Sequence, residues 1–190
     1  MEIGLFGGSF NPIHTGHCIL ASLIRQNLQL DEVWLNVSPQ NPLKSAFQPD
    51  YDRHRVEMVR LATEGKSGLK LCDIEFSMPR PSFTINTLER LSADFPGHRF
   101  RVIIGGDNWQ CFDKWLRHND IISKYGVIVY PRPGCPLPKQ IPEKNVILIQ
   151  APMLDISSTF IRESIKAGQD VDFLVPDKVA EYIKNNKLYL

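Results

Sequence analysis

The chain has 190 residues, enough for one domain with a substantial core, and 43% of them are hydrophobic, as in globular rather than disordered proteins. Its formal net charge is only +1, which excludes a global basic field that would attract nucleic acid or an anionic membrane. We therefore expect small molecules, and neither nucleic acid nor a membrane, as its partners.

Hydrophobic patterning predicts strands that alternate with helices along the whole chain. Runs that are almost entirely apolar indicate the strands, and apolar residues at helical spacing indicate the helices. In chain order we predict strand 1–6, helix 15–28, strand 32–37, a proline-containing loop at 38–49, helix 51–62, strand 69–72, a loop at 79–81, helix 84–95, strands 101–104, 127–130 and 146–149, and helices 158–167 and 176–186.

This alternation of apolar strands and helices predicts a parallel sheet covered on both faces, a doubly wound α/β fold. The length does not require two domains, so we predict a single domain over residues 1–190, with the C-terminal helices within 157–190 packing on the same core. Ligands bind such sheets beyond the carboxyl ends of the strands, at the switch point. The loops after strands 1–6 and 101–104 are therefore the first candidates for a site.

The four cysteines, at positions 18, 72, 111 and 135, are far apart in the sequence and form no C-x-x-C pair. This spacing favours buried thiols in a reducing compartment over a zinc site. The chain opens with Met1 and Glu2, whereas a signal peptide would carry basic residues there. We therefore expect a cytoplasmic protein.

The first segment with a chemical signature follows strand 1–6: residues 7–17 read GGSFNPIHTGH. Two adjacent glycines, Gly7 and Gly8, let a backbone approach a ligand closely, and the start of the next helix presents free N–H groups. This arrangement suits a phosphate. It matches neither the G-x-G-x-x-G fingerprint nor the G-x-x-x-x-G-K-[ST] loop.

Two histidines, His14 and His17, lie three residues apart in this segment, on one face of the predicted helix. Gly16 between them adds no side chain that would block a ligand. Imidazoles placed there can donate hydrogen bonds to phosphate oxygens and stabilise charge that develops in a transition state. The alternatives are a metal pair or a structural capping cluster, but no Cys, Asp or Glu lies nearby in sequence to complete a metal site.

The H-x-G-H sequence after G-G-[ST]-F-x-P resembles the signature of the nucleotidyltransferase superfamily. The resemblance implies a Rossmann-like α/β fold and transfer of a nucleotidyl group from a nucleoside triphosphate. It also implies that the residues in front of the histidines contact ATP: Gly7, Gly8, Ser9 and Phe10.

A second signature lies near the C-terminus, where residues 156–162 read ISSTFIR. Taken alone, hydroxyl residues before a helix are usually N-caps. Together with Arg162, however, they could offer hydroxyls, backbone N–H groups and a guanidinium to one anion. Paired with H-x-G-H, the segment resembles the superfamily's I-S-S-T-x-[IV]-R motif. The resemblance implies that it grips the β- and γ-phosphates of ATP through Ile156, Ser157, Ser158, Thr159 and Arg162.

The middle of the chain resembles the bacterial nicotinate-nucleotide adenylyltransferases, and the similarity covers nearly the whole length. Residues 41–44 (NPLK) stand where that family has a P-H-K-like segment with its lysine, here Lys44, on phosphate and on the pyridine nucleotide; Leu43 replaces the usual histidine. Residues 82–88 (SFTINTL) resemble the family's S-Y-T-x-D-T-L. Asn86 replaces an aspartate there, and the residues alone do not tell its consequence.

A G-G-D sequence that ends at Asp107, followed by Trp115, resembles the family's G-x-D…W segment. The resemblance implies that Gly105 and Asp107 contact the nucleotide and that Trp115 stacks on the pyridine ring, as indole does well. It also implies donors for a nicotinate carboxylate at Thr84 and at the backbone after Trp115, at Leu116.

Each of these residues also has a plain structural alternative. Thr84 could simply open a helix, Asp107 could cap one, and Trp115 could belong to the core. Lys44 and Arg53 could be solvated surface charges.

The implied reaction needs no nucleophile on the protein. The phosphate monoester of the mononucleotide would attack the α-phosphorus of ATP in line, and pyrophosphate would leave, so that catalysis reduces to positioning and charge stabilisation. His14 and His17 would act on the α- and β-phosphates, Lys44 and Arg162 would neutralise charge, and the hydroxyls of the second signature would hold pyrophosphate. We expect Mg²⁺ held chiefly by ATP oxygens, and no metal site built from protein residues.

Other functions stay open at this point. An adenylyltransferase acting on nicotinamide mononucleotide or phosphopantetheine is the nearest alternative, although residues 82–88 and Trp115 weigh against phosphopantetheine. A cytidylyltransferase for a polyol phosphate and a nucleotide-binding module without catalysis are further alternatives. Monomer or homo-oligomer is left undecided.

Overall fold

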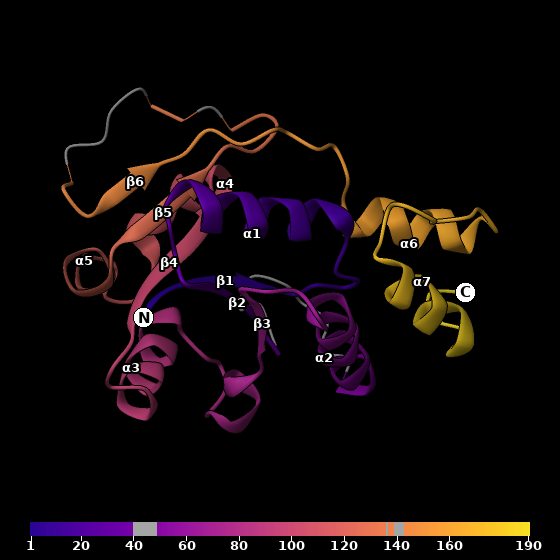
Figure 1. Cartoon of the computed structure of the whole chain (residues 1–190), viewed down its shortest axis with the longest axis horizontal. Coiled ribbons are helices and arrows are strands. Elements are labelled where there is room, and N and C mark those ends of the chain that lie inside the picture. Colours follow the sequence, from indigo (N-terminus) through magenta and orange to yellow (C-terminus); the bar gives the residue numbers. More distant parts are fainter. Residues whose placement is uncertain (40–48, 136, 139–142) are drawn as a thin grey trace.

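Six parallel strands form one sheet in the order β3-β2-β1-β4-β5-β6 (Figure 1). The computed structural model describes residues 1–39, 49–135, 137–138 and 143–190. The strands are β1 (Glu2–Gly8), β2 (Glu32–Val37), β3 (Leu69–Cys72), β4 (Arg99–Gly105), β5 (Val127–Tyr130) and β6 (Val146–Leu148).

The chain moves outward from the middle of the sheet twice, from β1 through β2 to β3 and then from β4 through β5 to β6. The order therefore reverses between β1 and β4, whose carboxyl ends lie side by side. This topology confirms the predicted doubly wound α/β fold.

Helices cover both faces of this sheet. The longer helices are α1 (Thr15–Asn27), α2 (Pro49–Thr63), α3 (Thr84–Asp94), α6 (Ser158–Lys166) and α7 (Asp177–Asn185). The short ones are η1 (Ile74–Ser77), α4 (Gly106–Trp109), η2 (Phe112–Lys114), α5 (His118–Asp120) and the π-helical η3 (Ile121–Tyr125).

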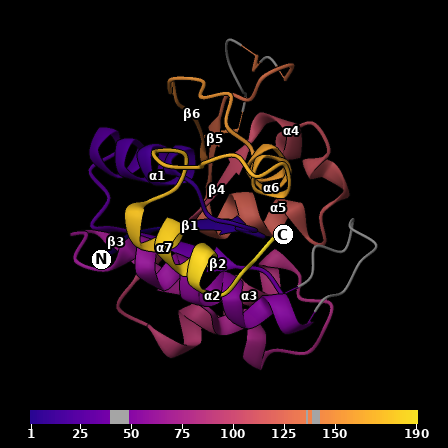
Figure 2. The same cartoon turned by 90° about the vertical axis from the view of Figure 1, so that its right-hand side faces the viewer.

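Two hydrophobic clusters lie on opposite faces of the sheet, because successive side chains of a strand point to opposite sides. Phe6 of β1 belongs to the first cluster, together with buried residues of α1, α2, α6 and α7. Leu5 belongs to the second cluster, with residues of α3, η2 and η3. Figure 2 shows α7 beside α2, and Figure 1 shows α6 and α7 at the end of the molecule where α1 begins.

The predicted elements differ from the observed ones in several places: the short helix η1 was not predicted, and β4 begins two residues earlier than predicted. β1 does not end at Phe6 but continues through Gly7 and Gly8, which pair with Asn36 and Val37 of β2; a ladder of backbone hydrogen bonds needs no side chain. Residues 106–125 hold the short helices α4, η2, α5 and η3, none of which was predicted. The predicted loop at 38–49 lies mostly outside the described residues. Among the described residues, no helix is long and apolar enough to cross a membrane.

Candidate active site

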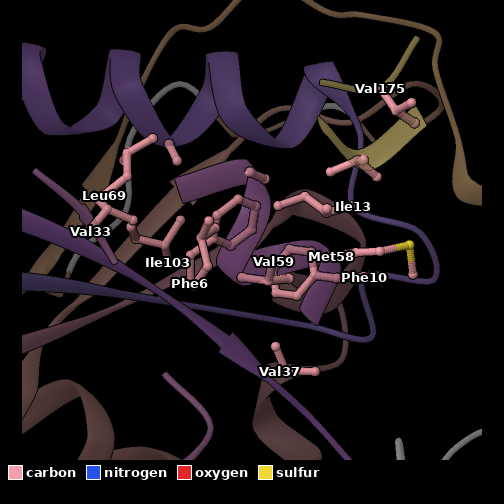
Figure 3. Close-up of a cluster of buried hydrophobic side chains, with 14 of the residues drawn as sticks. Phe6, Phe10, Ile13, Val33, Val37, Met58, Val59, Leu69, Ile103 and Val175 are labelled. Atoms are coloured by element: carbon pink, nitrogen blue, oxygen red, sulfur yellow. The ribbon is translucent and has the colours of Figure 1, made fainter. Parts of the chain in front are cut away.

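The loop after β1 is fixed by apolar side chains that point into the core. Phe10 and Ile13 are buried in the first cluster, close to Met58 of α2 (Figure 3). Phe10 adopts a left-handed backbone conformation, φ 44°, which a non-glycine residue keeps only when its surroundings enforce it. A Cβ on Gly8 would stand 2.9 Å from the Phe10 ring, whereas a Cβ on Gly7 would meet nothing within 4 Å. Gly8 therefore makes room for the core, and Gly7 leaves open space at the surface.

His14 and His17 stack on each other where α1 begins. His14 is the N-cap residue, and the two ring centroids lie 3.6 Å apart with an angle of 28° between the planes. The backbone N–H of His14 donates to Nδ1 of His17 at 3.3 Å, so a neutral His17 carries its proton on Nε2. A Cβ on Gly16 would stand 3.0 Å from Nδ1 of His14, so glycine keeps that ring in place.

Burial keeps both imidazoles neutral. Burial, and then the positive charge of Arg132, lowers the pKa of His14 to about 4. Burial, followed by His14 and Arg132, lowers the pKa of His17 well below its usual value. At pH 7 the pair therefore presents N–H donors without positive charge. Nδ1 of His14 is buried and has no hydrogen-bond partner among the described residues.

The second signature lies against the loop after β1, although the two are 146 residues apart at their point of contact. Ser157 caps α6 by accepting a hydrogen bond from the N–H of Phe160 at 3.1 Å. The hydroxyl of Ser158 donates to the carbonyl of Pro12 at 2.9 Å. The fold thus brings the two signatures into direct contact.

Arg162 strengthens this contact. Its guanidinium donates to the carbonyl of Asn11 at 2.8 Å and to the hydroxyl of Thr159 at 3.3 Å. The ion pairs between described residues do not include Arg162, so its charge is not neutralised by a carboxylate there. The hydroxyl of Tyr189, next to the end of the chain, donates to Oδ1 of the same Asn11 at 2.6 Å.

A cavity of about 60 Å³ opens beside the histidines. His14 and His17 line it from one side, Arg132 and Tyr130 from the carboxyl end of β5, and Ile156 from the second signature. The cavity is far smaller than the roughly 300 Å³ typical of ligand pockets, so it cannot enclose a ligand of ordinary size in this conformation.

Arg132 was not identified from the sequence. Its guanidinium stands 5.5 Å from the centre of the Tyr130 ring, and its Nε lies 3.6 Å from Oδ1 of Asp107. A Cβ on Gly105 would stand 2.9 Å from that Nε. The end of β4 therefore lies next to Arg132, which lines the cavity beside His14 and His17. The sequence signal that could have identified it is a cation two residues after the carboxyl end of an apolar strand.

Arg55 was also missed. It is buried on α2, pairs with Asp52 at 2.6 Å, and donates to the carbonyls of Ser9 at 2.6 Å and Ser38 at 2.8 Å. It thereby joins the loop after β1 to the end of β2. The neighbouring Arg53 is exposed, in agreement with its interpretation as a solvated surface charge. In the sequence, the only signal for this ion pair is the i,i+3 spacing of Asp52 and Arg55 on a predicted helix, and that spacing does not show that the pair is buried.

The residues predicted for a pyridine nucleotide lie on the other face of the sheet. Thr84 begins α3, which packs on the second cluster. Trp115 is half-buried against the same cluster, with its ring centroid 5.1 Å from that of Phe112, and Leu116 is exposed. No hydrogen bond or ring contact between described residues joins this group to the histidines. Lys44 and Leu43 lie outside the described residues.

Comparisons with known proteins give the family. The family model described as cytidylyltransferase-like matches residues 5–164. The Bacteroides thetaiotaomicron protein named "Probable nicotinate-nucleotide adenylyltransferase" is 43% identical over 184 residues, 97% of this chain and 91% of that protein. The Flavobacterium johnsoniae protein of the same name is 43% identical over 192 residues, 100% and 99% of the two chains.

A solved structure has the same fold. The Plasmodium falciparum nicotinic acid mononucleotide adenylyltransferase complexed with NaAD superimposes with a TM-score of 0.77 at 21% identity, over 99% of this chain and 97% of that one. The chain belongs to the cytidylyltransferase-like family and, within it, to the nicotinate-nucleotide adenylyltransferases.

Proposed function

We propose that the chain transfers AMP from ATP to nicotinate mononucleotide, forming nicotinate adenine dinucleotide and pyrophosphate. The observation that carries this proposal is the contact between the two phosphate-type signatures, in which Ser158 and Arg162 donate to the carbonyls of Pro12 and Asn11. The names of the relatives favour the pyridine nucleotide as the acceptor.

In the proposed reaction, an oxygen of the acceptor's phosphate monoester forms a bond to the α-phosphorus of ATP while the bond from that phosphorus to pyrophosphate breaks. The protein supplies geometry and charge stabilisation. The Nε2–H of His17 is directed by the hydrogen bond at its Nδ1, which suits it to donate to a phosphate oxygen. Neutral imidazoles next to Arg132 can bind the polyphosphate without first repelling that cation.

The remaining roles follow the same logic. Arg162 would neutralise charge on the leaving pyrophosphate, with the segment 156–159 around it, and Lys44 would do so from the acceptor side. Thr84, Trp115 and Leu116 would hold the pyridine nucleotide. The loops after β1 and β4, with Gly7, Gly8, Ser9, Phe10, Gly105 and Asp107, would hold ATP. Since the side chain of Phe10 is buried, its contact with ATP would come from the backbone.

The imidazole N–H, guanidinium and hydroxyl donors in this site suit phosphate oxygens, whereas Mg²⁺ prefers oxygen ligands. No group of three or more His, Cys, Asp or Glu side chains within the described ranges could hold a metal ion. We therefore propose that Mg²⁺ enters with ATP, bound by phosphate oxygens. We also propose a cytoplasmic location, since all four cysteine thiols are free.

The test is to incubate the pure protein with Mg-ATP and, in separate reactions, nicotinate mononucleotide, nicotinamide mononucleotide or phosphopantetheine. Pyrophosphate release is followed and the product is identified by mass. We expect nicotinate adenine dinucleotide, with little product from the other two acceptors. Turnover of another acceptor instead would contradict the assignment of Thr84 and Trp115. Binding of ATP without turnover of any acceptor would favour a nucleotide-binding module.

A further inference from the structure

Glu75, in η1, carries a buried carboxylate that the proposed mechanism does not use. Its side chain is 5% exposed and, among the described residues, accepts hydrogen bonds from four neutral donors. Asn36 at 2.6 Å and Thr87 at 3.0 Å donate to Oε1, and Ser82 at 2.7 Å and Ser38 at 3.1 Å donate to Oε2. The ion pairs between described residues do not include Glu75. Burying a carboxylate is costly unless it is hydrogen-bonded, and these four donors supply the hydrogen bonds that hold it.

The four donors come from two segments, one of which carries Thr84, a residue proposed to bind the acceptor. Asn36 and Ser38 stand at the carboxyl end of β2, where the chain continues toward Lys44. Ser82 and Thr87 lie on either side of Thr84, the first residue of α3. Glu75 therefore fixes the first turn of α3 against the end of β2.

The ATP side of the site is held by other contacts. Phe10 and Ile13 anchor the loop after β1 in the core, and Arg162 binds the carbonyl of Asn11. The two sides are connected through the backbone of β2. Gly7 and Gly8 pair with Asn36 and Val37, and the N–H of Ser38 donates to the carbonyl of Gly8 at 3.0 Å. Arg55 also donates to the carbonyls of Ser9 and Ser38. These connections use backbone groups, whereas Glu75 accepts from the hydroxyl of Ser38.

We propose that Glu75 is a positioning residue for the acceptor nucleotide, holding Thr84 and the end of β2 in the arrangement that binds it. This inference rests on the proposed function. Glu75 touches no substrate itself; it acts through the hydroxyls of Ser82 and Thr87. Removing the hydrogen bonds from Ser82 and Thr87 to Glu75 should weaken binding of the acceptor and leave binding of ATP unchanged.

The test uses the double variant Ser82→Ala/Thr87→Val in the full chain, with KM measured separately for nicotinate mononucleotide and for ATP. Valine keeps the shape of the buried threonine. We expect the KM for the acceptor to rise about tenfold, the scale of a small misplacement in a binding site, while the KM for ATP changes less than about twofold. Thr63→Val is the matched control: it removes a buried hydroxyl that donates to the carbonyl of Val59 at the end of α2, and both KM values should stay as in the wild type.

A double-mutant cycle shows whether the effect passes through Glu75. Ser82→Ala should raise the acceptor KM less in a Glu75→Gln background than in the wild type, because the partner that the hydroxyl needs is already changed. Equal factors in both backgrounds, or an equal rise of both KM values in a folded double variant, would overturn the inference. A wild type that fails to adenylylate nicotinate mononucleotide contradicts the proposed function itself; an active wild type with an unchanged acceptor KM in the double variant contradicts this inference alone.

Discussion

At the scale of single residues, the proposed site contains two imidazoles, of His14 and His17, that are neutral when no ligand is bound. Burial and Arg132 disfavour their charged forms, and the hydrogen bond to Nδ1 directs the N–H of His17. Bound polyphosphate would bring negative charge beside them, which favours the protonated form of an imidazole.

His17→Ala should lower kcat about 10²–10³-fold, the scale of losing one preorganised donor to a developing negative charge. Steady-state release of pyrophosphate measures the effect, and far-UV circular dichroism checks the fold. His54→Ala is the control, because this half-buried histidine on α2 is hydrogen-bonded to Tyr182 rather than directed at the cavity. Near-full activity of a folded His17→Ala variant would contradict the assigned role.

The low pKa of His14 also makes stability depend on pH. Its folded-state pKa, about 4, lies below the usual value of 6.5, so between these two values the unfolded chain binds more protons. Stability is therefore complete above pH 6.5 and falls as the pH drops, by about 3 kcal/mol at pH 4 for this one group.

Urea denaturation of the wild type and of His14→Asn at pH 7 and pH 4 measures this contribution. Asparagine is a good N-cap, so the start of α1 is preserved. Protonation of carboxylates with lowered pKa values, such as Glu64 and Asp120, also destabilises the folded protein in acid. This loss is the same in the wild type and in His14→Asn. The wild type should lose about 3 kcal/mol more than the variant. Equal losses would mean that His14 titrates normally in the folded protein.

At the scale of elements, the site is assembled where the ends of distant segments meet. Asn11 is the clearest case: its carbonyl accepts from Arg162 of α6, and its side chain accepts from Tyr189 at the C-terminal end. Tyr189 is partly buried and its ring lies 5.7 Å from that of Tyr51, so the last residues of the chain support the loop after β1.

Tyr189→Phe should therefore raise the KM for ATP about fivefold, roughly the value of one hydrogen bond, and leave the KM for nicotinate mononucleotide unchanged. Tyr182→Phe is a matched control on α7: its hydroxyl bonds to His54 at 2.8 Å, away from the loop, and neither KM should change. Initial rates with one substrate varied at a time separate the two constants. The same rise in both variants would show a general loosening of the C-terminal helices.

Sequence patterns predicted the long elements well, because their signals are local. The bounds of β2, β3 and β5 are as predicted, since each is a short, mainly apolar segment limited by polar or turn residues. The short helices within 106–125 were missed, because three to five residues are too few to show a period.

The same limit applies to the candidate site. His14, His17 and Arg162 stand in recognisable motifs, so the sequence alone is enough to select them. Arg132 and Glu75 are single charged residues without a motif, and their surroundings come from strands and helices far away in the sequence. Only tertiary contacts distinguish them from surface charges.

At the scale of the whole molecule, the sheet separates the two proposed substrate sides. The first cluster anchors the loop after β1, which we propose binds ATP, together with α6 and α7, whereas the second carries α3 and the segment with Trp115. Both sides meet at the carboxyl ends of β1 and β4, where the acceptor phosphate would have to reach the α-phosphorus. Bringing both groups together accurately requires that the two halves form one rigid unit.

This requirement can be tested by unfolding, because the tryptophans report on one half alone. Trp34, Trp109 and Trp115 all pack in or against the second cluster, while Ile183 of α7 is buried in the first. Ile183→Ala should destabilise the protein by about 2–5 kcal/mol through the cavity it leaves. If the chain is one cooperative domain, the urea midpoint from tryptophan fluorescence should fall as far as the midpoint from far-UV circular dichroism.

The exposed neighbour Glu181 provides the matched control on the same helix, and Glu181→Ala should change stability by less than about 0.5 kcal/mol. An unchanged fluorescence midpoint in Ile183→Ala, together with an early loss of helical signal, would mean that the C-terminal helices unfold separately. The second signature would then sit on a detachable unit, and ATP binding would have to order it. Coincident transitions instead place Arg162 and His17 on one rigid body, so that their spacing is already set before either substrate arrives.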